Sequence, residues 1–264
     1  MEDSMQIRIT QTAASVAQLM GFSMPQEADC PAARIVKPAE DRKIQRALLY
    51  NPDAIALWLY EKYHDDFIPT EEAARLTLPV RSVMPSVTPV CFASMYTGLQ
   101  PAQHGIQAYV KPVLQVPTLF DAALEAGLRP VIISTAGDSI SRIFLEREMD
   151  YIICKTPDEC NARAEEVLRA DRHDLIVVYN GNYDAWMHRY GPESEEALSQ
   201  LRHNLDAYER LSRIAQAAWA GKCGMTAFLP DHGCHEIDGQ LGSHGLDMEK
   251  DMNVIHFYRF YGLE

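Results

Sequence analysis

Residues 230–245, with the sequence PDHGCHEIDGQLGSHG, bring three histidines and three carboxylates together near the end of the chain. Imidazole and carboxylate groups in combination suit a divalent metal of intermediate hardness, such as zinc. Polar loops rich in Asp, His and Gly are also common without a metal. The segment therefore predicts a metal site only if other parts of the chain deliver further ligands to the same place.

The elements that would position such ligands follow a regular alternation. Apolar runs expected to form buried strands lie at 44–50, 129–136, 151–155, 174–180, 225–230 and 253–262, and helical spacing is found at 54–63, 118–127, 160–170 and 194–219. This alternation predicts an α/β fold with a mostly parallel central sheet and helices on both faces. Residues 1–42 are less regular, and we expect an N-terminal extension packed on the core of a single domain at 43–264.

Acidic side chains follow three of the expected strands directly. Asp53 comes after the first strand, Asp184 and His188 follow the strand at 174–180, and Asp231 and His232 follow the strand at 225–230. Parallel strands of such a sheet end at one shared edge, where ligands bind. We therefore expect these five side chains to converge there.

A further segment, MPSVTPVCFASMYTGLQPAQHGI at 84–106, contains Thr88 directly before Pro89. A proline favours the first turn of a helix, so Thr88 is expected at a helix N-terminus. One interpretation is that Thr88 is only the helix cap. The alternative is functional, because a hydroxyl at the positive end of a helix dipole can carry negative charge.

Four segments of the chain resemble the alkaline phosphatase superfamily, and its type I phosphodiesterase and nucleotide pyrophosphatase branch most closely. They are residues 84–106, YDAWMHRYGP at 183–192, PDHG at 230–233 and GSHG at 242–245. The resemblance runs from about residue 44 to the C-terminus. It implies an alkaline-phosphatase-like core and two divalent metal ions, most often zinc, with manganese as the alternative. One ion would be held by Asp184, His188 and His244, and the other by Asp53, Asp231, His232 and the oxygen of Thr88.

The implied activity is phosphoryl hydrolysis through a threonine nucleophile. Two metals roughly 4 Å apart can neutralise phosphate oxygens, activate a nucleophile and assist the leaving group. Thr88 would attack phosphorus to form a phosphothreonine intermediate, which water then hydrolyses. The substrate would be a small phosphorylated molecule, either a diester or pyrophosphate or a monoester. The alternatives are a degenerate member that binds metal or phosphate without turnover, a phosphonate hydrolase, and a phosphomutase.

Two positions near Thr88 depart from the phosphodiesterase pattern. Relatives commonly have an Asn three residues after the nucleophile, and this chain has Cys91, a weak donor. Pro89 has no N–H to offer a phosphate oxygen. The N–H groups of Val90 and Cys91 are expected to bind substrate in their place. A third departure is Ala54, where relatives often have Gly after the metal-binding Asp.

Rival members of the superfamily fit the sequence less well. Sulfatases begin from a modified Cys or Ser, whereas Thr88 occupies that position here and no Cys-x-Pro-x-Arg follows. Phosphopentomutases and cofactor-independent phosphoglycerate mutases carry a large inserted domain, whereas core strands and helices already fill the segment between Thr88 and Asp184.

Composition restricts the partners further. A net charge of −13 argues against a nucleic-acid polymer or an anionic membrane as partner. The chain begins without a basic and apolar leader, and its six cysteines are scattered, so we expect a cytoplasmic protein with reduced thiols. Nothing in the sequence indicates an oligomeric state.

Overall fold

A computed structural model of the chain describes residues 6–39 and 42–263. Its centre is an eight-stranded sheet with the order β1-β3-β10-β7-β2-β6-β4-β5. The strands are β1 (Ile7–Arg8), β2 (Arg46–Pro52), β3 (Leu76–Arg81), β4 (Pro130–Thr135), β5 (Asp150–Cys154), β6 (Leu175–Asn180), β7 (Gly224–Phe228) and β10 (Asn253–Tyr261). Only β10 runs antiparallel to its neighbours, β3 and β7. The prediction of a mostly parallel α/β sheet is confirmed.

The central strands are apolar throughout because both faces of the sheet are covered. In β2 the alternate residues Ala47 and Leu49 belong to one hydrophobic cluster, and Leu48 and Tyr50 belong to the other. All four are completely buried. Each strand thus contributes side chains to two cores, one on either side of the sheet.

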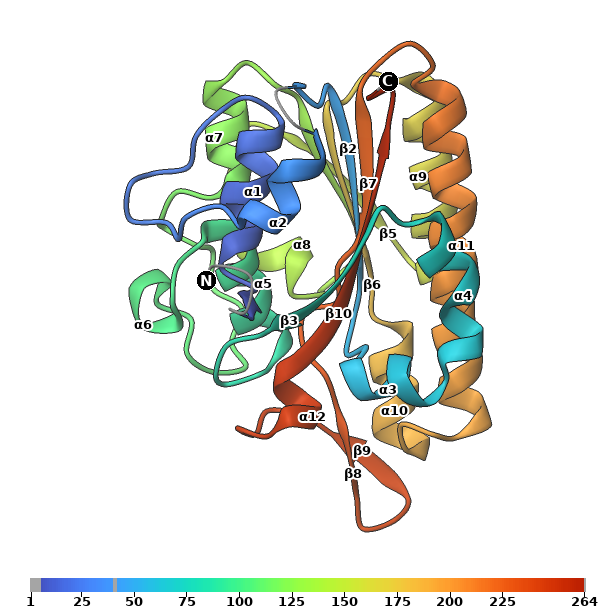
Figure 1. Ribbon diagram of the computed structural model, residues 1–264. Helices are drawn as coiled ribbons and strands as arrows, with labels where there is room; N and C mark the ends of the chain where they lie inside the picture. The colour runs from blue at the N-terminus through green and yellow to red at the C-terminus, as the bar shows by residue number, and fades with distance from the viewer. Residues whose placement is uncertain (1–5, 40–41, 264) are drawn as a thin grey trace.

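Two helical layers cover the sheet, as Figure 1 shows. One layer holds α1 (Gln11–Leu19), α2 (Ala33–Val36), α5 (Thr88–Thr97), α6 (Pro101–His104), α7 (Leu119–Glu125) and α8 (Ile140–Ile143). The other holds α3 (Leu57–Lys62), α4 (His64–Ala73), α9 (Pro157–Ala170), α10 (Asn182–Tyr190) and α11 (Glu195–Ala218). Short elements complete the described chain: η1 (Lys37–Ala39), α12 (Glu249–Met252) and the hairpin β8 (His235–Ile237) with β9 (Leu241–Ser243).

The N-terminal segment, predicted as an extension packed on the core, contributes to both the sheet and a helical layer. β1 pairs with β3 at the edge of the sheet, through Ile7 opposite Val80. Val16 of α1 lies in the same hydrophobic cluster as Leu49 of β2. Residues 1–5 and 40–41, which belong to the predicted extension, lie outside the described residues.

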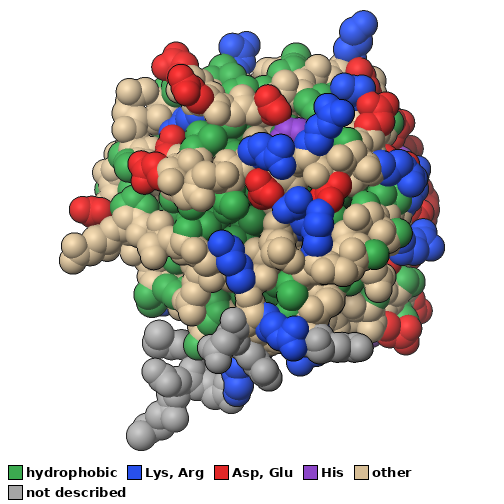
Figure 2. All heavy atoms as spheres, turned by 90° about the horizontal axis from the view of Figure 1, so that it is seen from above, with side chains coloured by type: hydrophobic (Ala, Val, Ile, Leu, Met, Phe, Trp, Pro, Cys, Tyr) green, Lys and Arg blue, Asp and Glu red, His purple; other side chains and the backbone are tan. Residues whose placement is uncertain are grey.

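The two ends of the sheet differ in chemistry. Figure 2 views the end at which the parallel strands begin, where Lys and Arg side chains are interspersed with Asp and Glu. Arg46 there lies between Asp171 and Asp174, with N–O distances of 2.6 and 2.7 Å. The carboxyl ends of β2, β6 and β7 point to the opposite end, where α10, α12 and the β8–β9 hairpin lie (Figure 1). Within the described residues, every helix is too short or too polar to cross a bilayer.

Candidate metal centre

Two clusters of potential metal ligands lie side by side at the carboxyl ends of the parallel strands. The first contains Asp53, Asp231 and His232, and the second contains Asp184, His188 and His244. Within each cluster, one atom from every residue lies within 4.8 Å of the others. The rings of His232 and His244 stack at 4.0 Å between centroids, so the clusters are neighbours. All six residues were candidates from the sequence, and the fold brings them to one edge.

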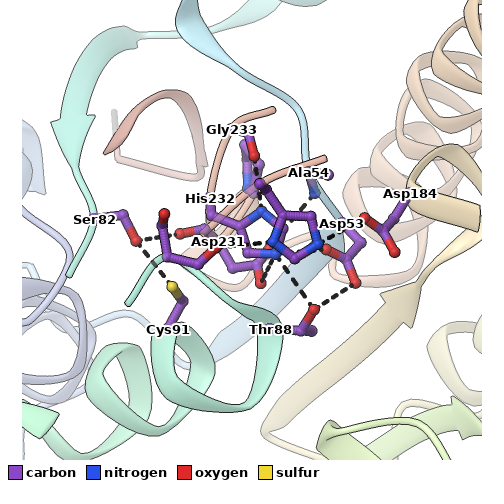
Figure 3. Close-up of polar contacts among 12 residues, drawn as sticks. Asp53, Ala54, Ser82, Thr88, Cys91, Asp184, Asp231, His232 and Gly233 are labelled. Atoms are coloured by element: carbon purple, nitrogen blue, oxygen red, sulfur yellow. Dashed lines mark hydrogen bonds and ion pairs between the residues drawn. The ribbon is translucent and has the colours of Figure 1, made fainter. Parts of the chain in front are cut away.

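The side chains of the first cluster are buried. Asp53 follows β2 and its N–H donates to the carbonyl of Asn180 at 3.0 Å, which ties it to the end of β6. Asp231 and His232 follow β7 in a buried loop, and the Asp231 carbonyl accepts a hydrogen bond from Ser82 at 2.6 Å. The Nε2 atom of His232 lies 3.3 Å from Asp53 and 3.4 Å from Asp231 (Figure 3).

The second cluster is more open. Asp184 and His188 are one turn apart on α10, so both side chains lie on the same helix face. His244 comes from the loop after β9. The Nε2 atoms of His188 and His244 lie 3.3 and 3.4 Å from the same oxygen of Asp184.

The three histidines share an arrangement that suits metal binding. The Nδ1 atoms of His188, His232 and His244 each lie 2.9 Å from a backbone carbonyl, those of Gly242, Gly233 and Ser86. A carbonyl only accepts, so each Nδ1 carries a proton, and each Nε2 is the nitrogen that can bind a metal once it is free of a proton. Such a backbone contact to the outer nitrogen is usual for metal-bound histidine.

Unpaired oxygens give the same indication. One carboxylate oxygen each of Asp53, Asp184 and Asp231 is buried without a hydrogen-bond donor. Buried anionic oxygens are costly unless a cation or donor compensates them. Three such oxygens beside three imidazole Nε2 atoms are a ligand set that could hold divalent cations.

Electrostatics shift the titration of these groups. Burial raises the pKa of Asp53 to about 7, with a further increase from the negative charge of Asp184. Burial and the carboxylate of Asp53 raise the pKa of Asp231 well above its ordinary value. Burial also acts to raise the pKa of Asp184, but pairing with His188 and His244 outweighs it and holds that pKa low. The same pairing raises the pKa of His188 to about 9. Without a metal ion, the raised pKa values of Asp53, Asp231 and His188 favour the protonated forms of these potential ligands.

Thr88 begins α5 and lies beside the first cluster. Its Oγ1 atom is 3.3 Å from Asp53 Oδ2 and 3.3 Å from His232 Nε2 (Figure 3). The N-cap residue of α5 is Val87, and the Thr88 hydroxyl makes no capping bond. The interpretation of Thr88 as a helix cap is therefore wrong, and its hydroxyl is directed into the site.

The substrate-binding role predicted for Val90 and Cys91 is not supported. Their N–H groups both donate to the carbonyl of Val87, at 3.0 Å each, so the first helical turn already uses them. The Cys91 thiol is completely buried, and its Sγ lies 3.1 Å from Ser82 Oγ, whose own proton is donated to the Asp231 carbonyl (Figure 3). Pro89 has no N–H, and the N–H groups of Val90 and Cys91 are already used. In this helical turn, the N–H of Thr88 is therefore the donor that has no partner among the described residues.

The departure at Ala54 has a structural consequence. Its backbone lies in the left-handed region, with φ of 64°, where glycine is unstrained and alanine costs roughly 1 kcal/mol. The turn directs the Ala54 N–H to Asp231 Oδ1 at 3.4 Å. The left-handed turn therefore links the strand end carrying Asp53 to the loop carrying Asp231.

A cavity of about 470 Å³ adjoins the two clusters. Asp53 and Asp184 form part of its wall, so it opens from the metal site itself. Its other walls include the aromatic rings of Tyr109 and Trp186 and the ammonium group of Lys111. The cavity can hold an organic group attached to a phosphate bound at the clusters.

Several residues at the site were not anticipated. Tyr179, at the end of β6, donates a short hydrogen bond to Asp53. Asp251 accepts from His235 at 2.7 Å and from the N–H of Leu246 at 2.9 Å, which anchors the loop after His244. The one sequence signal for Tyr179 is a phenol in the otherwise aliphatic run LIVVYN.

Comparisons with known proteins give a consistent result. The family model described as type I phosphodiesterase / nucleotide pyrophosphatase matches residues 72–135, a segment that contains Thr88. No curated protein sequence matches the chain. Among solved structures, human ectonucleotide pyrophosphatase / phosphodiesterase 5 is similar with a TM-score of 0.61 and 13% identity, over 81% of this chain and 88% of that one. The chain has the alkaline phosphatase superfamily fold.

Two other solved structures share this superfamily fold. Murine ectonucleotide pyrophosphatase / phosphodiesterase 5 is similar with a TM-score of 0.57 and 17% identity, over 74% of this chain. Phosphonoacetate hydrolase from Sinorhizobium meliloti 1021 has a TM-score of 0.54 and 20% identity, also over 74%. The chain spans 58% and 59% of the lengths of these two proteins. An inactive threonine-to-alanine form of the murine protein was solved in complex with AMP.

Proposed function

We propose that the chain is a metal-dependent phosphohydrolase in which Thr88 is the nucleophile. The observation that carries the proposal is the position of the Thr88 hydroxyl, 3.3 Å from both Asp53 and His232 at the start of α5. Two divalent cations, zinc or manganese, would neutralise the phosphate oxygens, favour the ionised hydroxyl and stabilise the leaving oxygen. The family model that matches the segment around Thr88 supports this proposal.

The residues of the chain would act in two steps. Thr88 Oγ forms a bond to phosphorus as the bond to the ester oxygen breaks, and the alcohol departs with a proton. Water then attacks the phosphothreonine, which releases phosphate or a phosphomonoester and restores the Thr88 hydroxyl. The free N–H of Thr88, at the positive end of the α5 dipole, favours an anionic phosphoryl group at this place.

The cavity leaves room for a substrate larger than a small monoester. It touches Asp53 and Asp184, whereas Thr88 does not belong to its wall. A diester carries a second organic group that a monoester lacks, and a cavity beside the clusters could hold it. We therefore propose phosphodiesterase or nucleotide pyrophosphatase activity ahead of simple phosphatase activity.

A substrate panel tests this assignment. Protein loaded with zinc or with manganese is assayed on bis-(4-nitrophenyl) phosphate, 4-nitrophenyl phosphate, 4-nitrophenyl sulfate and phosphonoacetate, with Thr88→Ala as the control for contaminating phosphatases. We expect kcat/KM to be highest for the diester and negligible for the sulfate. Faster hydrolysis of the sulfate or the phosphonate would assign a different activity. A metal-loaded protein that turns over none of them would support the degenerate, ligand-binding alternative.

Metal binding should release protons, because the metal-free site holds them. At pH 7 His188 is protonated, since its pKa is about 9, and Asp53 is about half protonated, since its pKa is about 7. A cation needs the His188 lone pair and the Asp53 carboxylate, so binding must expel these protons. We expect at least one proton released per chain at pH 7 from these two groups, a further contribution from Asp231, whose pKa is also raised, and an affinity that increases with pH up to about 9.

Titration calorimetry in two buffers of different ionisation enthalpy measures the proton release directly. The observed enthalpy should differ between buffers in proportion to the protons released. Equal enthalpies in both buffers would contradict binding at His188 and Asp53.

A further inference from the structure

Tyr179 connects the sheet to the first cluster through a single hydrogen bond. Its hydroxyl donates to Asp53 Oδ2, the same oxygen that accepts from Thr88 at 3.3 Å. The other oxygen, Oδ1, has no donor and lies 3.3 Å from His232 Nε2. The two oxygens of Asp53 thus have separate partners: protein donors hold Oδ2, and Oδ1 is left for a cation.

Phe92 and Gly181 are both close neighbours of Tyr179. Phe92 of α5 packs edge-on against it, with 5.6 Å between centroids and an interplanar angle of 85°. At Gly181, an added Cβ atom would lie 2.7 Å from the Tyr179 oxygen. Gly181 has φ of −93°, which any residue can adopt. A glycine is therefore required there because it has no Cβ atom, and not because of its backbone conformation. The hydroxyl reaches Asp53 because position 181 is a glycine.

We propose that Tyr179 is a positioning residue for the metal bound by Asp53, Asp231 and His232, and that Gly181 provides the space for its hydroxyl. Without this donor, the Asp53 carboxylate can rotate and exchange the roles of its two oxygens. The inference rests on the proposed metal-dependent function, but it concerns one of the two clusters only. His188 and His244 contact neither Tyr179 nor Gly181 through any hydrogen bond in the described chain.

The test measures the affinity of both metals in Tyr179→Phe by competition with a chromogenic zinc chelator. Loss of an outer hydrogen bond to a metal ligand typically costs 10–100-fold in affinity. We expect that loss for one zinc ion and an unchanged affinity for the other. Tyr208→Phe is the matched control, because it removes a buried tyrosine hydroxyl that contacts Thr226 at 3.3 Å, away from the site. This control should bind both ions as the wild type does.

A second variant separates positioning from a general loss of packing. Gly181→Ala should also weaken one ion, because the added methyl group displaces the Tyr179 oxygen. The double variant Gly181→Ala with Tyr179→Phe should be close to Tyr179→Phe alone, since the 2.7 Å contact disappears with the hydroxyl. The contacts that remain, with two ring carbons at 3.2 and 3.3 Å, require the ring to shift by only a few tenths of an ångström. Additive losses would contradict the proposed pairing.

The outcomes distinguish this role from the proposed function. If the wild type binds two zinc ions and Tyr179→Phe binds both with unchanged affinity, the positioning role is wrong and the metal centre stands. If both ions weaken equally in Tyr179→Phe, the tyrosine supports the whole fold of the site and is not specific to Asp53. A wild type that binds no zinc would overturn the metal centre and this role together.

Discussion

Thr88→Ala is expected to lower kcat for diester hydrolysis by roughly 10³-fold or more while leaving two metal ions bound. The substitution removes the one hydroxyl that lies between Asp53 and His232, at 3.3 Å from each. Asp53, Asp231 and His232 still offer three ligand atoms to the ion of the first cluster. The measurement is steady-state hydrolysis of bis-(4-nitrophenyl) phosphate together with metal analysis of the same preparation.

Two variants serve as controls for this loss. Thr88→Ser keeps the nucleophilic oxygen and should retain part of the activity. Thr97→Ala removes a buried hydroxyl at the other end of α5, where it donates to the Ala93 carbonyl at 2.7 Å, and should leave kcat unchanged. Substantial hydrolysis by Thr88→Ala would show that water attacks the phosphorus directly, without a phosphothreonine.

The position of the site could be predicted from strand ends alone. Asp53, Asp184 and Asp231 each follow a buried strand, and parallel strands end at a common edge, so their convergence follows from the fold class. His188 was accessible in the same way, because it lies one helical turn after Asp184.

His244 could not be placed by such an argument. It reaches Asp184 only because the β8–β9 hairpin turns back after His232, and three-residue strands carry little periodic signal. Its assignment as a candidate came from the resemblance of GSHG to a family motif. The strand β3 was missed for a related reason: LTLPVR contains Pro79, and a proline within a run argues against a strand inside a sheet.

The hydrogen bonds of the backbone near Thr88 cannot be predicted from the sequence. A helix N-terminus leaves free N–H groups in general, but here the Val87 carbonyl accepts from both Val90 and Cys91. Tyr179 was missed because a tyrosine in a buried strand is usually core, and only the structure shows where its hydroxyl points. Side-chain orientation therefore limits prediction of the site more than the arrangement of the strands does.

The second large effect is expected for Asp231→Asn, which should weaken metal binding and stabilise the metal-free fold. Asp231 is 0% exposed, has one oxygen without a donor, and lies in the same cluster as the buried carboxylate of Asp53. Burial and that neighbour raise its pKa well above the ordinary value, so the metal-free fold is destabilised by this carboxylate. An amide cannot ionise, and it can donate to His232 Nε2, which lies 3.4 Å from Asp231 Oδ2.

We therefore expect Asp231→Asn to lose one metal ion and its diesterase activity, and to raise the Tm of the metal-free protein by roughly 2–4 °C, equivalent to about 1 kcal/mol. Metal analysis and thermal unfolding in the presence of a chelator measure the two effects.

Asp251→Asn is the contrasting control: both of its oxygens accept hydrogen bonds, from His235 at 2.7 Å and Leu246 at 2.9 Å. It should lower the Tm under the same conditions, because it breaks a satisfied buried pair. A lower Tm in both variants would mean that Asp231 stabilises the metal-free fold. It would contradict the idea that this carboxylate binds metal at a cost in stability.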